Sequence, residues 1–218
     1  MAGLVHRGEV VRNDEGLADS EVERFVADGF VQLASAFPRE VADAGRALLW
    51  AATGCNPDDP ATWTQPVVRL PGFGDEPFRA AANTPRLRAA FDQLVGAGRW
   101  VPRAGLGTFP IRFPHPDDPG DDGVEFFALA RRAVPASEHR PVVTATGAAG
   151  DVYLCHPFLV HAAQRHRSVR PKFMAQPPLD PVGELDLDRS PPVPGRTGGT
   201  ARSGPDVSGP ARVGPLTP

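Results

Sequence analysis

Residues 150–161 read Gly-Asp-Val-Tyr-Leu-Cys-His-Pro-Phe-Leu-Val-His, and a basic run follows at 165–172. The glycine and aspartate are typical of a tight turn, and the residues after them predict a half-buried strand. Pro157 has no N–H to give to a sheet, so His156 lies at a strand end or bend, with His161 beyond it. Such a stretch presents a histidine at a strand end with cations close by, an arrangement that suits a metal ion beside an anion.

The size and charge of the chain restrict its class. It has 218 residues, of which 41% are hydrophobic, and a formal net charge of −3 at pH 7. This length suits one domain with one core, and the charge favours neither a nucleic-acid surface nor a polybasic membrane anchor. We therefore expect a small-molecule substrate as the partner, with no nucleic acid and no membrane involved. Nothing in the composition indicates an oligomeric state.

Targeting signals and cysteine use favour the cytoplasm. Residues 1–19 carry charges throughout and lack the apolar run of a signal peptide, and no later stretch reaches about 20 continuous apolar residues. Cys55 and Cys155 lack the spacing of a zinc or redox pair. We expect a cytoplasmic protein whose two cysteines are reduced core thiols.

Composition divides the chain near Phe173, its last aromatic residue. Residues 177–218 are dense in proline, glycine, serine and arginine without apolar periodicity, so burial cannot offset the entropy cost of ordering them. We expect one domain at 1–176 and a disordered tail at 177–218.

Apolar spacing and turn residues predict the elements of this domain. Helices are expected at 20–29, 38–54, 87–96 and 124–134, and strands at 30–33, 66–70, 107–113, 141–146, 151–155 and 172–176. Ser20 and Glu23 have the spacing of a capping box, and Pro110 indicates an edge strand or a bulge. Because helices come first and strands follow, the order favours an α+β fold with a β-sandwich or barrel core.

One His-x-Asp pair, His115 and Asp117, is a candidate for metal binding. Residues i and i+2 of a strand face the same way, so such a pair and one distant histidine can bind one iron ion. Prolines flank the pair on both sides, so a solvated loop is an open alternative. His156 and His161 are five residues apart and point to opposite faces of a straight strand. They can equally be one core and one rim histidine.

The motifs together resemble the phytanoyl-CoA dioxygenase family. Gly150-Asp151, the His156-Pro157 pair, His161 and the basic residues about ten positions later are similar to its C-terminal signature. The stretches 29–33, 37–41 and 107–113 look like its N-terminal part, so the resemblance spans residues 17–179. It implies N-terminal helices on a double-stranded β-helix, a jelly-roll-like core. It also implies an oxidoreductase, a dioxygenase that hydroxylates a small organic substrate with Fe(II) and 2-oxoglutarate.

The resemblance also assigns residues. His161 matches the distal iron histidine of the family, and His115 with Asp117 would complete the iron ligands. Lys172 stands where the family has the arginine that binds the carboxylate of 2-oxoglutarate, and Arg170 lies two residues earlier. Lysine offers one point charge where arginine offers a two-pronged fork, so weaker binding of 2-oxoglutarate is expected.

The chain departs from the family in its middle. In the family, the loop corresponding to 117–123 leads into the His-x-Asp strand and several more strands, whereas here Gly123 passes directly into the helix predicted at 124–134. A strand needs about five to six residues, so 118–150 is too short for the missing strands. We expect an internal deletion after Gly123 and an incomplete core.

Three functions stay open at this point. The first is the Fe(II)/2-oxoglutarate dioxygenase that the resemblance implies. The second is a catalytically inactive remnant that acts as a binding or interaction module, because the expected deletion removes core strands. The third is a cupin-like metal protein that uses His156 and His161 in a different geometry.

Overall fold

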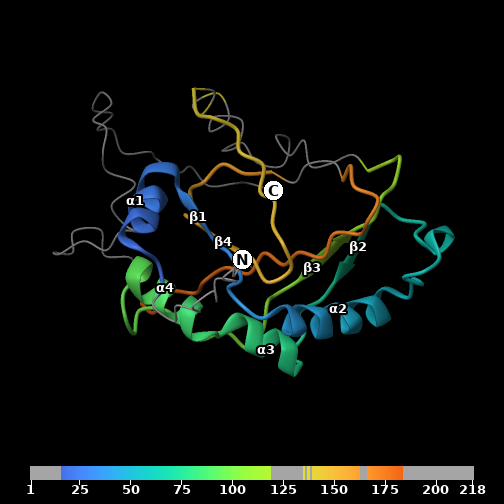
Figure 1. Ribbon diagram of the computed structural model, residues 1–218, viewed down its shortest axis with the longest axis horizontal. Coiled ribbons are helices and arrows are strands. Elements are labelled where there is room, and N and C mark those ends of the chain that lie inside the picture. Colours follow the sequence, from blue (N-terminus) through green and yellow to red (C-terminus); the bar gives the residue numbers. More distant parts are fainter. Residues whose placement is uncertain (1–15, 119–134, 136, 138, 163–165, 184–218) are drawn as a thin grey trace, which may run out of the picture.

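The computed structural model describes residues 16–118, 135, 137, 139–162 and 166–183 (Figure 1). The helix predicted at 124–134 and the part of the predicted tail after residue 183 lie outside the described residues. The elements, in chain order, are α1 (Asp19–Asp28), β1 (Phe30–Leu33), α2 (Arg39–Thr53), the 3-10 helix η1 (Pro60–Thr62), β2 (Val67–Leu70), α3 (Glu76–Ala82), α4 (Pro85–Val95), β3 (Phe109–Arg112) and β4 (Val152–Cys155). This is a mixture of helices and small antiparallel sheets, as the α+β prediction required.

The strands form two separate antiparallel pairs. In the first sheet, β1 pairs with β4 in a register that sets Leu33 opposite Val152. In the second, β2 pairs with β3, with Arg69 opposite Pro110. Within the described ranges the strands do not close into a barrel, so the double-stranded β-helix is not confirmed and stays a prediction.

Two predicted strands are wrong. Residues 141–146 form no ladder and are exposed, with Val142 99% accessible. Residues 172–176 contribute only a single bridge, between Lys172 and Arg112. A β-prone sequence becomes a strand only when a neighbour pairs with it and one face is covered, and neither condition is met at 141–146 among the described residues.

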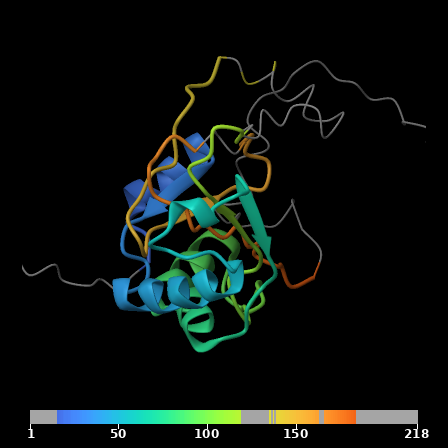
Figure 2. The ribbon, with the colours of Figure 1, turned by 90° about the vertical axis from the view of Figure 1, so that its right-hand side faces the viewer.

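Each sheet packs on its own hydrophobic core. The first core joins α1 and α4 to the β1–β4 pair through the buried residues Leu17, Phe25, Val31, Leu33, Ala36, Leu87, Ala90, Leu94 and Leu154. The second core lies under the β2–β3 pair and contains Leu49, Leu70, Phe78, Phe109, Ile111 and Phe113. Helices α2 and α3 supply part of the second core and lie on the same side of the strands in both views (Figure 1 and Figure 2).

The helix ends follow local chemistry, with two departures from the predictions. Gly29 and Gly54, where these two helices were predicted to end, cap α1 and α2 in the left-handed conformation. Helix α1, however, begins after Ala18, whose N–H donates to the Glu21 carboxylate at 2.8 Å, so the capping box at Ser20 is wrong. Helix α3 was not predicted, because it has only seven residues and a proline near its start.

The chain beyond residue 176 continues against the domain for a short distance. The N–H of Val101 donates to the carbonyl of Asp180 at 2.9 Å, and the N–H of Val182 donates to the carbonyl of Arg99 at 2.8 Å. Both cysteines are free, but Cys155 is exposed, so its prediction as a core thiol is wrong. No helix in the described ranges has the length and apolar character needed to cross a bilayer.

Candidate functional site

Asp151, the aspartate of the Gly150-Asp151 motif, links the start of β4 to neighbouring segments by hydrogen bonds. One carboxylate oxygen of Asp151 accepts the N–H of Ser35 at 2.8 Å. The other accepts the N–H of Ala148 at 2.9 Å and the side-chain amide of Gln32 at 3.0 Å. Burial raises the pKa of Asp151, but these hydrogen bonds outweigh it and leave the pKa below its usual value. Asp151 therefore joins the start of β4 to β1 and to the turn that follows β1.

Gly150 allows the close approach that this joint requires. Its φ is +100°, a value that L side chains rarely adopt, and a Cβ there would lie 2.4 Å from the carbonyl oxygen of Phe37. The carbonyl of Gly150 also accepts the N–H of Phe37 at 3.3 Å. Gly150 and Asp151, the first part of the motif that resembles the family signature, thus have a structural role in this chain.

The two histidines after β4 have different surroundings. The N–H of His156 donates to the carbonyl of Gly29 at 2.8 Å, and its half-buried ring lies 6.3 Å from that of Phe25. His161 is exposed, and its Nδ1 lies 2.9 Å from the carbonyl oxygen of Leu159. This is the arrangement of one packed and one rim histidine.

His115 and Asp117 lie in a turn after β3. The N–H of Asp117 donates to Nδ1 of His115 at 3.1 Å, and that Nδ1 is 3.8 Å from the Asp117 carboxylate. The Asp117 side chain is 85% exposed. The pair therefore has the required residue types but not the strand setting that would aim both side chains at one point.

The predicted iron ligands are not gathered into one site. In the part of the chain that the structure describes, which includes His115, Asp117 and His161, no group of three or more histidine, cysteine, aspartate or glutamate residues could hold a metal ion. In this arrangement these residues do not fit the iron that the resemblance implies, and no chemical step through iron follows from it. The iron ligand set stays a prediction.

A buried ion pair that the sequence did not reveal lies next to the predicted cosubstrate lysine. Arg112 at the end of β3 is 7% exposed and Asp118 is 2% exposed. The Arg112 guanidinium is 2.9 Å from one carboxylate oxygen of Asp118, and the other oxygen accepts the N–H of His166 at 2.7 Å. The described contacts of this carboxylate thus include a cation and a backbone donor.

Lys172 lies directly opposite Arg112. The two backbones exchange hydrogen bonds of 3.1 and 2.8 Å as an isolated antiparallel bridge. Directly opposite residues of an antiparallel pair point to the same face, with Cα atoms about 5.5 Å apart in a hydrogen-bonded pair. The Lys172 and Arg112 side chains therefore share one face. Arg170, the other predicted cosubstrate residue, is exposed, and its carbonyl accepts Nε2–H of His166 at 2.5 Å.

The electrostatics of this face favour an anion. Burial lowers the pKa of the Lys172 ammonium, and the positive charge of Arg112 lowers it further. Among the described carboxylates, none pairs with Lys172, whereas Asp118 pairs with Arg112. Among the described residues, the two cations Arg112 and Lys172 therefore lie on one half-buried face with the carboxylate of Asp118. We call Arg112, Lys172, Asp118 and the N–H of His166 the cationic site.

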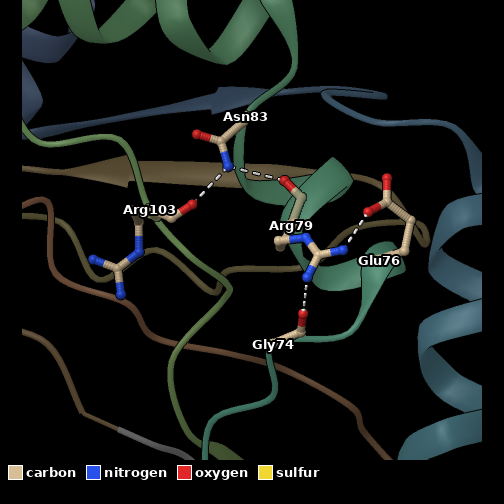
Figure 3. Close-up of polar contacts among 5 residues, drawn as sticks. All are labelled: Gly74, Glu76, Arg79, Asn83 and Arg103. Carbon is tan, nitrogen blue, oxygen red and sulfur yellow. Dashed lines mark hydrogen bonds and ion pairs between the residues drawn. The ribbon is translucent and has the colours of Figure 1, made fainter.

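Two other features of the described structure, a set of hydrogen bonds at the end of α3 and a pocket on the second sheet, are less suited to binding an anion. The side-chain amide of Asn83 donates to the carbonyls of Arg79 and Arg103, and Arg79 contacts Glu76 and the carbonyl of Gly74 (Figure 3). These contacts fix the end of α3 to the chain before β3. A pocket of about 260 Å³ lies on the β2–β3 pair and is lined by Arg69, Leu70, Thr108, Phe109, Pro110 and Gln176. None of the predicted site residues lines it.

Sequence reasoning found one of the four members of the cationic site, Lys172, and missed Arg112, Asp118 and the N–H of His166. Lys172 came from its position in the family resemblance. Arg112, the last residue of β3, lies between the buried residues Ile111 and Phe113, and this was the only local signal of its burial. Comparisons of the chain with models of protein families, with curated proteins and with solved structures find no match.

Proposed function

We propose that this chain is a catalytically inactive relative of the phytanoyl-CoA dioxygenase family that binds a small organic carboxylate of the 2-oxoglutarate class. The carboxylate would bind at the cationic site. The observation that carries this proposal is Lys172, a half-buried cation that faces Arg112 and pairs with no described carboxylate. Under this proposal the β1–β4 and β2–β3 pairs are what remains of an incomplete double-stranded β-helix in a cytoplasmic protein.

The energy available from one lysine matches a weak ligand. Two unit charges 4 Å apart attract by about 4 kcal/mol at an effective dielectric constant of about 20. A dissociation constant of about 1 mM corresponds to a similar free energy. Lys172 lacks the two-pronged geometry of arginine, and the Arg112 guanidinium already contacts Asp118. Millimolar rather than micromolar affinity for 2-oxoglutarate is the expected result.

The single lysine of the chain provides a direct test, because Lys172 is the only lysine in the sequence. An amine-reactive acylating reagent modifies Lys172 and the α-amino group, and peptide mass spectrometry separates the two products. We expect millimolar 2-oxoglutarate to slow acylation of Lys172 while acylation of the α-amino group is unchanged. Equal concentrations of chloride serve as the control for ionic strength.

Calorimetric titration with 2-oxoglutarate gives the second readout. Lys172→Met should abolish binding, and Arg39→Met should not, because the Arg39 side chain is 67% exposed in a surface ion pair. If 2-oxoglutarate neither protects Lys172 nor gives heat that depends on Lys172, the proposed function is wrong.

A second candidate is the Fe(II)/2-oxoglutarate-dependent hydroxylation implied by the resemblance. It is favoured by one observation, the 3.8 Å approach of His115 Nδ1 to the Asp117 carboxylate, which keeps a His-x-Asp pair together. The test is the weak visible absorption band of the protein mixed anaerobically with Fe(II) and 2-oxoglutarate. The candidate requires this band, its loss in His161→Ala, and succinate formation once oxygen is added. Absence of both the band and succinate would eliminate it.

A further inference from the structure

We infer that Asp118 is an internal ligand of the cationic site: its carboxylate occupies the position that an external carboxylate takes, and the two compete for Arg112 and the N–H of His166. The inference uses the proposed function only for the chemical class of the external ligand. The position itself is defined by the contacts of Asp118.

The contacts of Asp118 are those that a bound carboxylate would need. A guanidinium contacts one oxygen at 2.9 Å, and a backbone N–H contacts the other at 2.7 Å. Guanidinium and amide donors form the short, charge-assisted hydrogen bonds that proteins use to bind carboxylates. With Asp118 only 2% exposed, the carboxylate lies inside the protein as a ligand would.

The charge balance explains why exchange is favourable for a dicarboxylate. Asp118 supplies one negative charge, and the structure describes its ion pair with Arg112. A dicarboxylate can place one carboxylate against Arg112 and the other against Lys172, which lies on the same face. An external dicarboxylate can therefore contact Arg112 and Lys172 at the same time, through two separate carboxylates.

Asp118 has the advantage of being tethered. It follows Arg112 by six residues, so its effective concentration at the site exceeds that of a free ligand. The tether lowers the apparent affinity of any external carboxylate. Displacement would also release the N–H of His166, a contact between segments 48 residues apart, and so would free the basic run from the turn after β3.

Chemical rescue tests the internal ligand directly. Asp118→Ala removes the carboxylate and leaves Arg112 and the N–H of His166 open to an external carboxylate, for which acetate is the probe. We expect acetate to raise the Tm of Asp118→Ala by about 2–4 °C over the same concentration of chloride, and to leave the Tm of the wild type unchanged. The matched control is Asp43→Ala, which removes a carboxylate 2.8 Å from Arg46 on the exposed surface of α2 and should show no acetate effect. Equal Tm values of Asp118→Ala in acetate and chloride would overturn the inference.

A second variant covers the case in which Asp118→Ala does not fold. Asp118→Asn keeps the size of the side chain and removes the charge that competes with the ligand. The concentration of 2-oxoglutarate that half-protects Lys172 from acylation should be lower than in the wild type by about tenfold. An unchanged half-protecting concentration contradicts competition. Acetate rescue without any 2-oxoglutarate protection would uphold the internal ligand and reject the proposed function, so the two failures are distinguishable.

Discussion

Two aspartates connect the two sheets to distant loops, and they do so with different partners. Asp151 accepts hydrogen bonds from three neutral N–H donors beside the β1–β4 pair. Asp118 contacts a buried guanidinium beside the β2–β3 pair, with a second cation on the same face. Neutral donors satisfy the hydrogen-bonding capacity of the Asp151 carboxylate, but they bring no positive charge that could attract an external anion. The guanidinium beside Asp118 has a second cation next to it, Lys172, which pairs with no described carboxylate and which another anion can contact.

The largest effect should come from breaking the Arg112–Asp118 pair. Arg112→Met removes the guanidinium that contacts the carboxylate of Asp118, which is 2% exposed, and removal of one partner of a buried pair costs about 3–5 kcal/mol. Arg112→Met combined with Asp118→Leu removes both charges and should recover most of that loss. Urea unfolding of the two single variants and the double variant measures the coupling.

If the double variant is no more stable than Arg112→Met alone, the ion pair does not hold the turn after β3 in place. Asp118 and Asp151 would then differ in the loops that they connect rather than in the charge of their partners.

Gly150 should give the next largest effect, on the side of the neutral aspartate. Gly150→Ala introduces a Cβ that meets the Phe37 carbonyl at 2.4 Å, in addition to the strain of a φ of +100°. Positive φ at a non-glycine residue alone costs about 1–3 kcal/mol, so the total should exceed that of a matched glycine. Gly54→Ala is that control, because its φ is +70° and no atom lies within 4 Å of the new Cβ. Thermal unfolding should show a larger loss of stability for Gly150→Ala than for Gly54→Ala. Equal losses of stability would mean that Phe37 moves aside.

Local pattern was sufficient for most elements and insufficient for the contacts between them. The strand at Phe30–Leu33 and the ends of α1 and α2 at Gly29 and Gly54 depend on neighbouring residues, and the sequence predicted them. The strand predicted at 141–146 depends on a distant partner, and its apolar residues are exposed instead. The same limit applies to the capping box, because Ser20 and Glu23 have the spacing but Glu21 makes the contact.

The candidate site shows the limit more clearly. Lys172 could be identified by its place in a motif. The Arg112–Asp118 pair forms a binding site only together with the N–H of His166, which lies 48 residues after Asp118. Burial of an arginine in a strand of four residues has no sequence pattern of its own. A pairing that depends on three separate segments cannot be read from any one of them.

The smallest effect concerns the charge of Asp151 and depends on pH. Its pKa in the folded protein lies below the ordinary value of 3.8, so folding favours the ionised form, and its stabilising contribution is fully present above that ordinary value. The contribution is lost as pH falls through the folded pKa, below 3.8. Asp151→Asn keeps the shape of the side chain but offers one acceptor oxygen, so it should be less stable than the wild type at neutral pH. The difference in unfolding free energy should shrink as the pH is lowered through that range. A difference that stays constant down to acidic pH would mean that the shape of the side chain, rather than its charge, holds the turn, and Asp151 would then differ from Asp118 more sharply still.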